Sequence, residues 1–195
     1  QNEFRRFFSL IGVLGGRRRL KASDQMFDIL IHSVRKMASA KIGALIVLPA
    51  EENIQPYIRG GYPLDGKVSE PLLLSIFDPS SPGHDGAIII EDGRIKKFGV
   101  YLPLGRDVEL VRSFGTRHLA ALGLSEVSDA LVISVSEEKG MVSVFHNKTQ
   151  TIMKNDIELE VVLNKFSDER FPQAVKKDFK KWARTKLAPV VLSMT

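Results

Sequence analysis

The 195-residue sequence contains no cysteine. It can therefore form neither a disulfide nor a thiolate zinc site, and this composition fits a reducing compartment. No apolar run in the chain approaches the ~18 residues that a membrane-spanning helix requires. The chain begins with neither an initiator methionine nor the pattern of a signal peptide, and we expect it to be a fragment of a longer protein.

The common catalytic and nucleotide-binding motifs are also missing. There is no G-x-x-x-x-G-K-[ST] loop, and Gly12, Gly15 and Gly16 do not form a dinucleotide-binding fingerprint. The sequence contains neither a G-x-S-x-G elbow nor an H-E-x-x-H pair. These absences exclude the familiar signatures of phosphate-loop NTPases, dinucleotide-dependent enzymes, α/β-hydrolases and zinc proteases.

Length and composition favour a single domain with short appendages. Hydrophobic residues make up 44% of the chain, enough for a substantial core. The net charge is +5, and much of the basic charge lies near the two ends, in Arg5, Arg6, Arg17, Arg18, Arg19, Lys21, Lys176, Lys177, Lys180, Lys181, Arg184 and Lys186. Such runs are most often solvated surface, so we expect no nucleic-acid partner.

The spacing of apolar residues predicts both helices and strands. Helices are expected over residues 2–14, from Ser23 to about Ala40, from Ser69 to Phe77, and over residues 156–163 and 172–187. Residues 42–48 have the composition of a strand that is covered on both faces, whereas residues 51–67 resemble a loop containing at most a short strand at 57–59.

Two hairpins complete the expected fold. The first runs from Ala87 through the turn Glu91-Asp92-Gly93 to Leu104, and the second joins residues 129–136 to residues 141–145. A doubly covered strand together with antiparallel hairpins predicts an α/β fold. We expect a single globular domain with a mixed central β-sheet flanked by helices.

Three short stretches carry side chains suited to chemistry. His84 and Asp85 stand at the start of the strand, and the small residues Gly86 and Ala87 leave room for a ligand. Gly115 and Thr116 open a helix beside Arg117 and His118, a combination suited to a phosphate. The third stretch, Ser136 to Glu138, follows a strand. Alone, these patterns are most often a turn, a helix cap and a solvated hairpin.

Together and in this order, the stretches resemble the diadenylate cyclase domain, a bacterial family that condenses two ATP molecules into cyclic di-AMP. The resemblance rests on Asp85-Gly86-Ala87, on Gly115-Thr116-Arg117-His118, and on the Ala-Ala-Leu-Gly-Leu-Ser-Glu run at residues 120–126. It extends over about residues 23–151. One position departs from the family, whose Arg-His-Arg motif has arginine where this sequence has Leu119.

The resemblance implies a division of the chain. Residues 1–22 would be a basic amphipathic lead segment, residues 23–151 the catalytic core, and residues 152–195 a mainly helical C-terminal extension. The lead segment, His84 and the Tyr101-Leu102-Pro103-Leu104 run are most similar to the membrane-anchored branch of the family. We therefore expect a soluble fragment of a protein that lies at the cytoplasmic face of the cell membrane, anchored through a missing N-terminal segment and controlled by an unknown protein regulator.

The resemblance also implies roles for individual residues. Asp85, Arg117 and His118 would be catalytic, and His84, Asp85 and Glu138 would bind a divalent metal (manganese, cobalt or magnesium). ATP would contact Gly86, Ala87, Tyr101, Leu102, Gly115, Thr116, Arg117 and Ser136, with Tyr101 stacked on adenine.

The chain has one copy of each motif, and the product contains two linked nucleotides. A homodimer that brings two ATP sites face to face is therefore expected to be required for catalysis. The alternative is a catalytically weak or silent regulatory module that binds adenine nucleotides. Such a module would tolerate the loss of Asp85, so the presence of both Asp85 and Glu138 favours the enzyme.

Overall fold

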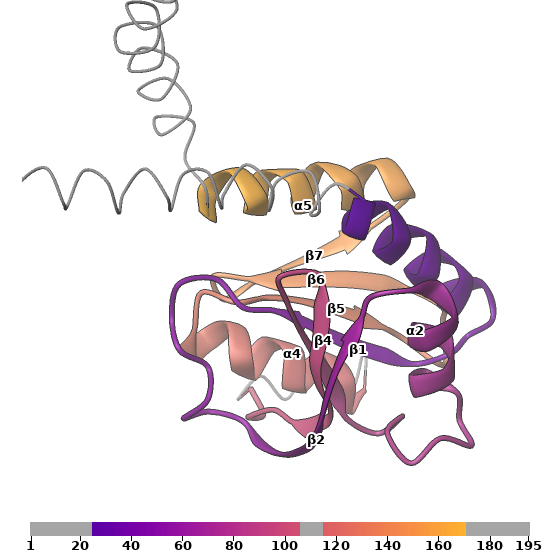
Figure 1. Cartoon of the computed structure of the whole chain (residues 1–195). Helices are drawn as coiled ribbons and strands as arrows, with labels where there is room; N and C mark the ends of the chain where they lie inside the picture. Colours follow the sequence, from indigo (N-terminus) through magenta and orange to yellow (C-terminus); the bar gives the residue numbers. More distant parts are fainter. Residues whose placement is uncertain (1–24, 106–114, 171–195) are drawn as a thin grey trace, which may run out of the picture.

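The computed structural model describes residues 25–105 and 115–170. The helices predicted for residues 2–14 and 172–187, and the cap at Ser23, lie outside these ranges. Within them the chain forms one seven-stranded sheet with helices on both faces (Figure 1). The elements in chain order are a helix over residues 25–39, β1 (Ala44–Leu48), β2 (Arg59–Lys67), α2 (Glu70–Phe77), β3 (Ala87–Glu91), β4 (Arg94–Tyr101), α4 (Thr116–Val127), β5 (Leu131–Val135), β6 (Val142–His146), β7 (Thr149–Met153) and α5 (Asp156–Arg170).

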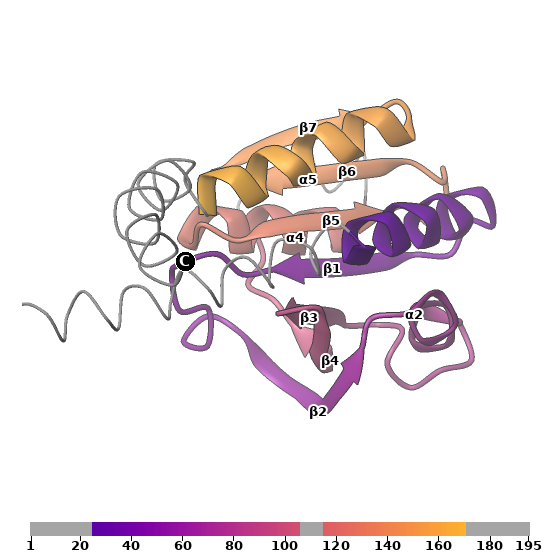
Figure 2. The same cartoon turned by 45° about the horizontal axis from the view of Figure 1, so that its top comes forward.

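The sheet has the strand order β2-β4-β3-β1-β5-β6-β7, which can be followed in Figure 2. β1 lies in the middle and pairs with β3 in parallel, with Ile46 opposite Ile88. Its other neighbour, β5, is antiparallel and places Ile133 opposite Ile46. The remaining strand pairs are antiparallel, which confirms the expected mixed sheet and both predicted hairpins.

β1 is buried on both faces, as its composition predicts. Ala44, Ile46 and Leu48 belong to an apolar cluster that includes residues of the helix over 25–39, of α2 and of α5. Leu45 and Val47 face the other way, into a cluster with α4. Burial of one such Leu, Ile or Val side chain contributes about 1.5–3 kcal/mol, so this alternation stabilises the sheet between two layers of helix.

The helix over residues 25–39 holds two other helices in place. His32 Nε2 lies 3.0 Å from the Glu70 carboxylate at the start of α2, and the Lys36 ammonium also binds Glu70. Lys36 is the main reason why the pKa of Glu70 lies below its usual value. Arg35 Nη1 donates a hydrogen bond of 3.0 Å to Asp156 at the start of α5. The two contacts with Glu70 orient α2, whose end leads directly into the loop that carries His84 and Asp85.

The prediction of a loop over residues 51–67 was wrong for its second half. β2 is an edge strand with mostly exposed side chains, and its pairing with β4 is interrupted between Pro63 and Gly66. Gly60 and Gly61 have positive φ angles of 64° and 83°, as does Asp65 at 53°. Proline and glycine are tolerated in this strand because one side has no partner strand that would require their N–H groups.

The packed body extends beyond the region of resemblance. β7 adds a seventh strand that sequence patterns did not indicate, and α5 is longer than the helix expected over residues 156–163. Leu159, Leu163 and Phe166 of α5 belong to the same apolar cluster as the helix over residues 25–39. The first part of the predicted C-terminal extension is therefore integral to the fold.

Candidate active site

The sheet topology brings the candidate residues to one edge of the sheet, the one formed by the ends of the central strands and not by the outer strand β2. β1 and β3 are parallel, so both begin at the same edge, and the antiparallel strands β4 and β5 end there. In register, Ala87 at the start of β3 lies opposite Val100, and Ala44 at the start of β1 lies opposite Val135. The residues that flank these positions therefore lie along that edge. They are His84-Asp85, Tyr101 and Ser136 to Glu138.

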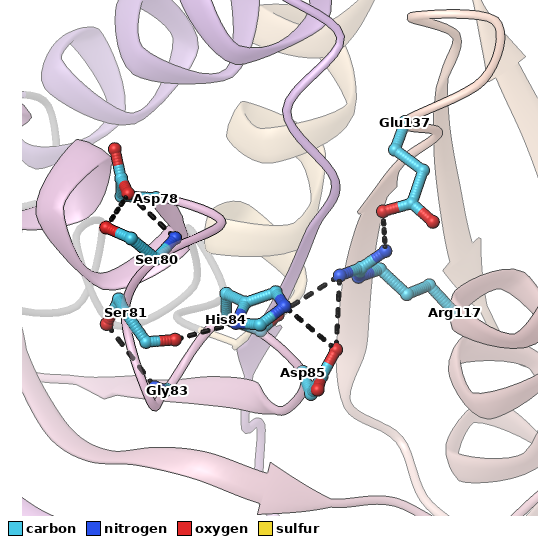
Figure 3. Close-up of polar contacts among 8 residues, drawn as sticks. All are labelled: Asp78, Ser80, Ser81, Gly83, His84, Asp85, Arg117 and Glu137. Carbon is cyan, nitrogen blue, oxygen red and sulfur yellow. Dashed lines mark hydrogen bonds and ion pairs between the residues drawn. The ribbon is translucent and has the colours of Figure 1, made fainter.

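A series of turns holds the loop between α2 and β3 (Figure 3). Asp78 accepts hydrogen bonds from the backbone N–H and the hydroxyl of Ser80, and these bonds hold the pKa of Asp78 below its usual value. The Ser81 hydroxyl accepts the Gly83 N–H at 3.3 Å. The Ser81 carbonyl lies 2.6 Å from His84 Nδ1. The loop thus fixes the orientation of the His84 ring.

The contact with Ser81 also determines which nitrogen of His84 carries a proton. A carbonyl oxygen can only accept, so Nδ1 must donate. In the neutral ring Nε2 then presents a lone pair, and it lies 3.2 Å from Asp85 Oδ1. Two acceptors at this distance repel each other unless a cation lies between them. Either a proton or a metal ion satisfies that requirement.

The spacing of the two atoms fits a metal ion. Two ligands at right angles around a metal with bonds of about 2.1 Å are ~3.0 Å apart, and the observed separation is 3.2 Å. Asp85 is 75% exposed, so an ion could reach it from solvent. Within residues 25–105 and 115–170 no cluster of three or more His, Cys, Asp or Glu side chains could hold a metal. A bound ion would therefore need further ligands from water or substrate.

Arg117 joins the two main motifs. It is the second residue of α4, and its side chain is only 16% exposed. Nη2 donates a hydrogen bond of 3.2 Å to the His84 carbonyl and lies 4.0 Å from Asp85 Oδ1 (Figure 3). Thirty-two positions separate Arg117 from Asp85 in the chain. The structure places the guanidinium between the turn that carries His84 and Asp85 and the end of β5.

The acidic partner of Arg117 at the end of β5 is Glu137, which sequence reasoning missed. Arg117 Nη1 donates a hydrogen bond of 2.6 Å to Glu137 Oε2. The neighbouring Glu138, predicted as a metal ligand, is exposed. Both glutamates stand in the same turn, so composition alone does not distinguish them. Only the side-chain directions in the folded turn show that Glu137 is the one that meets Arg117, and no sequence signal indicates it.

Tyr101 lies at the same edge and is open to solvent. It ends β4 opposite Arg59, and its side chain is 63% exposed. A Cβ added to Gly60 would stand 3.4 Å from Tyr101 Cδ2, so the ring has the glycine backbone on one side. Leu102, the next residue, is buried among the apolar side chains beneath α4. An exposed aromatic ring beside a fixed backbone is suited to stacking with a planar ligand.

The space beside Gly86 is occupied by the protein itself. A Cβ at this position would stand 2.4 Å from the backbone carbon of Gly99 in β4. Ala87 is fully buried in the cluster beneath α4. These two small residues therefore permit the close approach of β4, which fills the space into which a Cβ of Gly86 would project.

His118 faces the core instead of the edge. It is 0% exposed, and its two ring nitrogens lie 3.2 Å from the hydroxyls of Ser134 and Ser143. Its ring meets Phe145 edge-on, with centroids 5.8 Å apart. Burial, with a smaller contribution from the Lys139 charge, lowers the pKa of His118 to about 4. A neutral histidine in this place links α4 to β5 and β6.

The remaining predicted residues lie around this centre. Gly115 is the N-cap of α4 with a φ of 83°, and it and Thr116 are exposed beside Arg117. Ser136 is buried and turns the chain after β5. Leu119, which stands where the family has arginine, is buried, and its carbonyl accepts the Gly105 N–H at 2.9 Å.

The chain has a clear family assignment. Residues 31–150 match the family described as DisA bacterial checkpoint controller nucleotide-binding, and with the fold described above this places the chain in the class of α/β nucleotide-binding domains. The chain belongs to this family, the diadenylate cyclase (DAC) domain. The match includes both the Asp85 turn and the start of α4.

Curated relatives agree with this assignment. Cyclic di-AMP synthase CdaA of Bacillus subtilis is 39% identical over an alignment of 150 residues that covers 74% of this chain and 55% of that protein. A diadenylate cyclase of Listeria monocytogenes is 42% identical over 129 residues, 66% of this chain and 47% of that protein. The chain thus spans about half the length of these relatives.

Solved structures share the fold. The crystal structure of a double mutant of DacA from Staphylococcus aureus is 38% identical with a TM-score of 0.69, and the match covers 78% of this chain and 99% of that one. The crystal structure of a protein from Bacillus cereus described as a hypothetical membrane-spanning protein matches with a TM-score of 0.63 and 38% identity over 65% of this chain and 62% of that chain. Among the described residues of the present chain, no helix has the length and apolar character needed to cross a membrane.

Proposed function

We propose that this domain is a diadenylate cyclase, which condenses two ATP molecules into cyclic di-AMP and two diphosphates. One observation carries the proposal. The Asp85 carboxylate and the Arg117 guanidinium, from motifs far apart in the chain, meet at an exposed edge of the sheet. In a chain 42% identical to a protein named diadenylate cyclase, this is the pairing that the reaction needs.

The reaction forms a bond between the 3′-oxygen of one ATP and the α-phosphorus of the other. The bond between the α-phosphorus and its bridging oxygen breaks, and diphosphate leaves with that oxygen. The hydroxyl proton must be accepted, and negative charge on the phosphates must be stabilised. A second, identical step closes the ring.

Asp85 and Arg117 supply these two functions. The exposed Asp85 carboxylate accepts the proton from the attacking hydroxyl, directly or through a water molecule. Arg117, whose guanidinium is held by Glu137 and by the His84 carbonyl, binds phosphate oxygens beside the exposed N-terminus of α4. Thr116 adds a hydroxyl at the same helix end. Tyr101, at the end of β4, stacks against adenine.

His84 and Asp85 are suited to hold a divalent metal ion. When bound, the ion screens the negative charge of the phosphates. Nε2 of His84 is available for it because Nδ1 is engaged with Ser81. A nitrogen ligand favours manganese or cobalt over magnesium. His118 has no access to the edge, and in this proposal its role is to hold α4, and with it Arg117, against β5 and β6.

The reaction also requires two sites. Each chain offers one Asp85 and one Arg117, so the ribose hydroxyl of each bound ATP must reach the α-phosphate held by a second chain. The exposure of Asp85 and Tyr101 supports an edge that faces a partner. An isologous pair of protomers is the simplest arrangement that satisfies this geometry.

Product identification tests the proposal directly. The protein is incubated with ATP and, in separate reactions, manganese, cobalt or magnesium, and the nucleotides are identified by mass. Cyclic di-AMP together with diphosphate in a 1:2 ratio is the expected result. ATP that is bound but unchanged under every metal would instead indicate a silent nucleotide-binding module. Release of inorganic phosphate or linear products alone would also contradict the proposal.

A further inference from the structure

Gly43, just before β1, lies beneath the ion pair between Arg117 and Glu137. A Cβ built on Gly43 would stand 2.4 Å from Arg117 Nη1, 2.7 Å from Arg117 Cζ and 3.0 Å from Glu137 Oε2. These are the three nearest heavy atoms, and all belong to the two side chains of the ion pair. The guanidinium therefore lies directly against the backbone of Gly43.

Space, and not backbone conformation, explains why glycine stands here. The φ angle of Gly43 lies outside the left-handed region, so alanine could adopt the same backbone. A side chain would nevertheless occupy the volume of the guanidinium. To regain an ordinary contact of 3.4 Å, Nη1 would have to move by ~1 Å, a displacement that can reduce catalysis by about 100-fold when a reacting group is misplaced.

Three contacts together determine where the Arg117 guanidinium lies. The backbone at Gly43 lies next to Nη1 and Cζ, Glu137 accepts a hydrogen bond from Nη1, and the His84 carbonyl accepts one from Nη2. A long, flexible side chain is thereby held in one position before any ligand arrives. We infer that Gly43 is a positioning residue for Arg117 in phosphate binding. The inference rests on the proposed function, because it assigns a purpose to the position of the guanidinium.

The test is a double-mutant cycle between Gly43→Ala and Arg117→Ala, read out as nucleotide affinity. The probe is 3′-deoxyATP, which lacks the attacking hydroxyl and so binds without turnover, titrated in the presence of manganese. We expect Gly43→Ala to weaken binding by about tenfold or more when Arg117 is present, which is the order expected when a charge-assisted hydrogen bond is lost. In the Arg117→Ala background the same substitution should change affinity by less than about twofold.

Gly66→Ala is the matched control. Gly66 lies in β2, its φ is also outside the left-handed region, and an added Cβ would meet only the flexible Leu72 and Leu64 side chains, at 3.0 Å and beyond. It should bind 3′-deoxyATP as the parent does. Thermal unfolding of all variants shows whether Gly43→Ala alters the fold. If it alone unfolds the protein, a folded double variant with Arg117→Ala still supports the clash with the guanidinium.

The outcomes separate the inference from the proposed function. An equal loss of affinity in both backgrounds, no loss in either, or a double variant that fails to fold would overturn the role of Gly43. Failure of the parent protein to bind 3′-deoxyATP at all would contradict the proposed function. Binding by the parent and undiminished binding by Gly43→Ala would leave the function intact and reject the inference.

Discussion

At the residue scale, the Asp85 carboxylate lies at the centre of the site but contributes little to the stability of the fold. It is 75% exposed, and its neighbours are His84 Nε2 at 3.2 Å and Arg117 Nη2 at 4.0 Å. Ion pairs with one exposed member contribute roughly 0–1 kcal/mol to stability. A change at Asp85 should therefore affect chemistry without unfolding the protein.

We predict that Asp85→Asn lowers cyclic di-AMP formation by about 100-fold or more while thermal stability changes little, because the amide preserves shape but cannot accept a proton. Product is quantified from equal amounts of folded protein. Asp28→Asn, on the exposed side of the helix over residues 25–39, is the same chemical change far from the site and should leave activity unaltered. Near-normal turnover by Asp85→Asn would reject the assigned role.

The ring of His84 gives a second prediction at this scale. Its Nδ1 is engaged with the Ser81 carbonyl, so Nε2 is the nitrogen that can meet an ion beside Asp85. His84→Ala should lower activity with manganese or cobalt more than with magnesium, which gains least from a nitrogen ligand. The measured quantity is the ratio of manganese-supported to magnesium-supported activity. An unchanged ratio would contradict the role, and His146→Ala, at the opposite end of the sheet from the site, should leave the ratio unchanged.

His118 predicts a dependence of stability on pH. Burial lowers its pKa in the folded state from 6.5 to about 4, whereas the unfolded chain keeps the ordinary value. Between these values the unfolded state binds a proton that the folded state does not. The contribution to stability is therefore complete above pH 6.5 and is lost as the pH falls toward 4, by about 1.4 kcal/mol per pH unit.

Urea unfolding at pH 7, 6 and 5 checks this prediction by comparison of the parent with His118→Gln. The variant retains a polar side chain that can face Ser134 or Ser143 but has no proton to gain in this range. As the pH is lowered from 7 to 5, the free energy of unfolding of the variant should decrease less than that of the parent. The same slope in both proteins would show that other groups account for the pH dependence.

At the scale of elements, α4 and the segment after β4 depend on each other. A Cβ on Gly123 of α4 would stand 2.2 Å from the carbonyl oxygen of Pro103 and 2.5 Å from the Gly105 nitrogen. The Gly105 N–H also donates to the Leu119 carbonyl of α4. The helix can therefore lie directly on this segment, which follows Tyr101 and Leu102. This packing explains why glycine stands at position 123.

Gly123→Ala should therefore destabilise the fold, although alanine favours a helix. The gain in helix propensity is about 1 kcal/mol, whereas a backbone clash of this kind costs roughly 1–3 kcal/mol or more. We predict a net loss of stability in urea unfolding and weaker adenine binding, since Tyr101 would shift with the segment. Val127→Ala at the exposed end of α4 is the control. A Gly123→Ala protein that is more stable than the parent would show that residues 103–105 can move away from the added methyl group at little cost.

Several elements could be predicted from sequence because their signals are local. Continuous apolar runs predicted β1, β3 and β5, and the Asp92-Gly93 turn predicted the β3–β4 hairpin. β2 was missed because glycine, proline and an Asp-Gly pair are typical of loops, and only its pairing with β4 makes it a strand. Tertiary pairing at the sheet edge overrides local preference there.

The site was predictable in its motifs but not in its contacts. The Asp85 turn and Arg117 are visible as sequence signals, and their approach to within 4.0 Å depends on a sheet in which β1 and β3 are parallel. Which of Glu137 and Glu138 faces Arg117 depends on the turn after β5, and the burial of His118 depends on β6. Such side-chain directions are not encoded in local spacing.

At the scale of the whole molecule, Asp85, Tyr101 and Arg117 at the start of α4 lie along one edge of a single domain. The core lies between the sheet and its two layers of helix, and the edge with Asp85 and Tyr101 remains exposed to solvent. Under the proposed function, one chain therefore presents one ATP site. A product with two equivalent phosphodiester links then requires two chains in the proposed reaction.

We predict that catalysis depends on protein concentration. Below the dissociation constant of the catalytic dimer, specific activity should rise in proportion to concentration, because the fraction of paired chains rises. Initial rates are measured over a wide dilution series at saturating ATP and metal. The monomer–dimer equilibrium is followed in the same solutions by analytical ultracentrifugation. Activity per molecule that remains constant well below the measured dissociation constant would exclude a site shared by two chains.

Mixing gives an independent test of the same arrangement. Asp85→Asn chains should pair with parent chains, because Asp85 is exposed at the edge and contributes little to folding. In a mixed pair the variant can still bind ATP, but one of the two bond-forming steps lacks its proton acceptor. An excess of variant should therefore lower cyclic di-AMP formation per parent chain and cause a linear dinucleotide to accumulate. Protein carrying Asp28→Asn in equal excess should instead add its own activity. If cyclic di-AMP formation per parent chain does not change when Asp85→Asn protein is added, each chain completes the reaction alone.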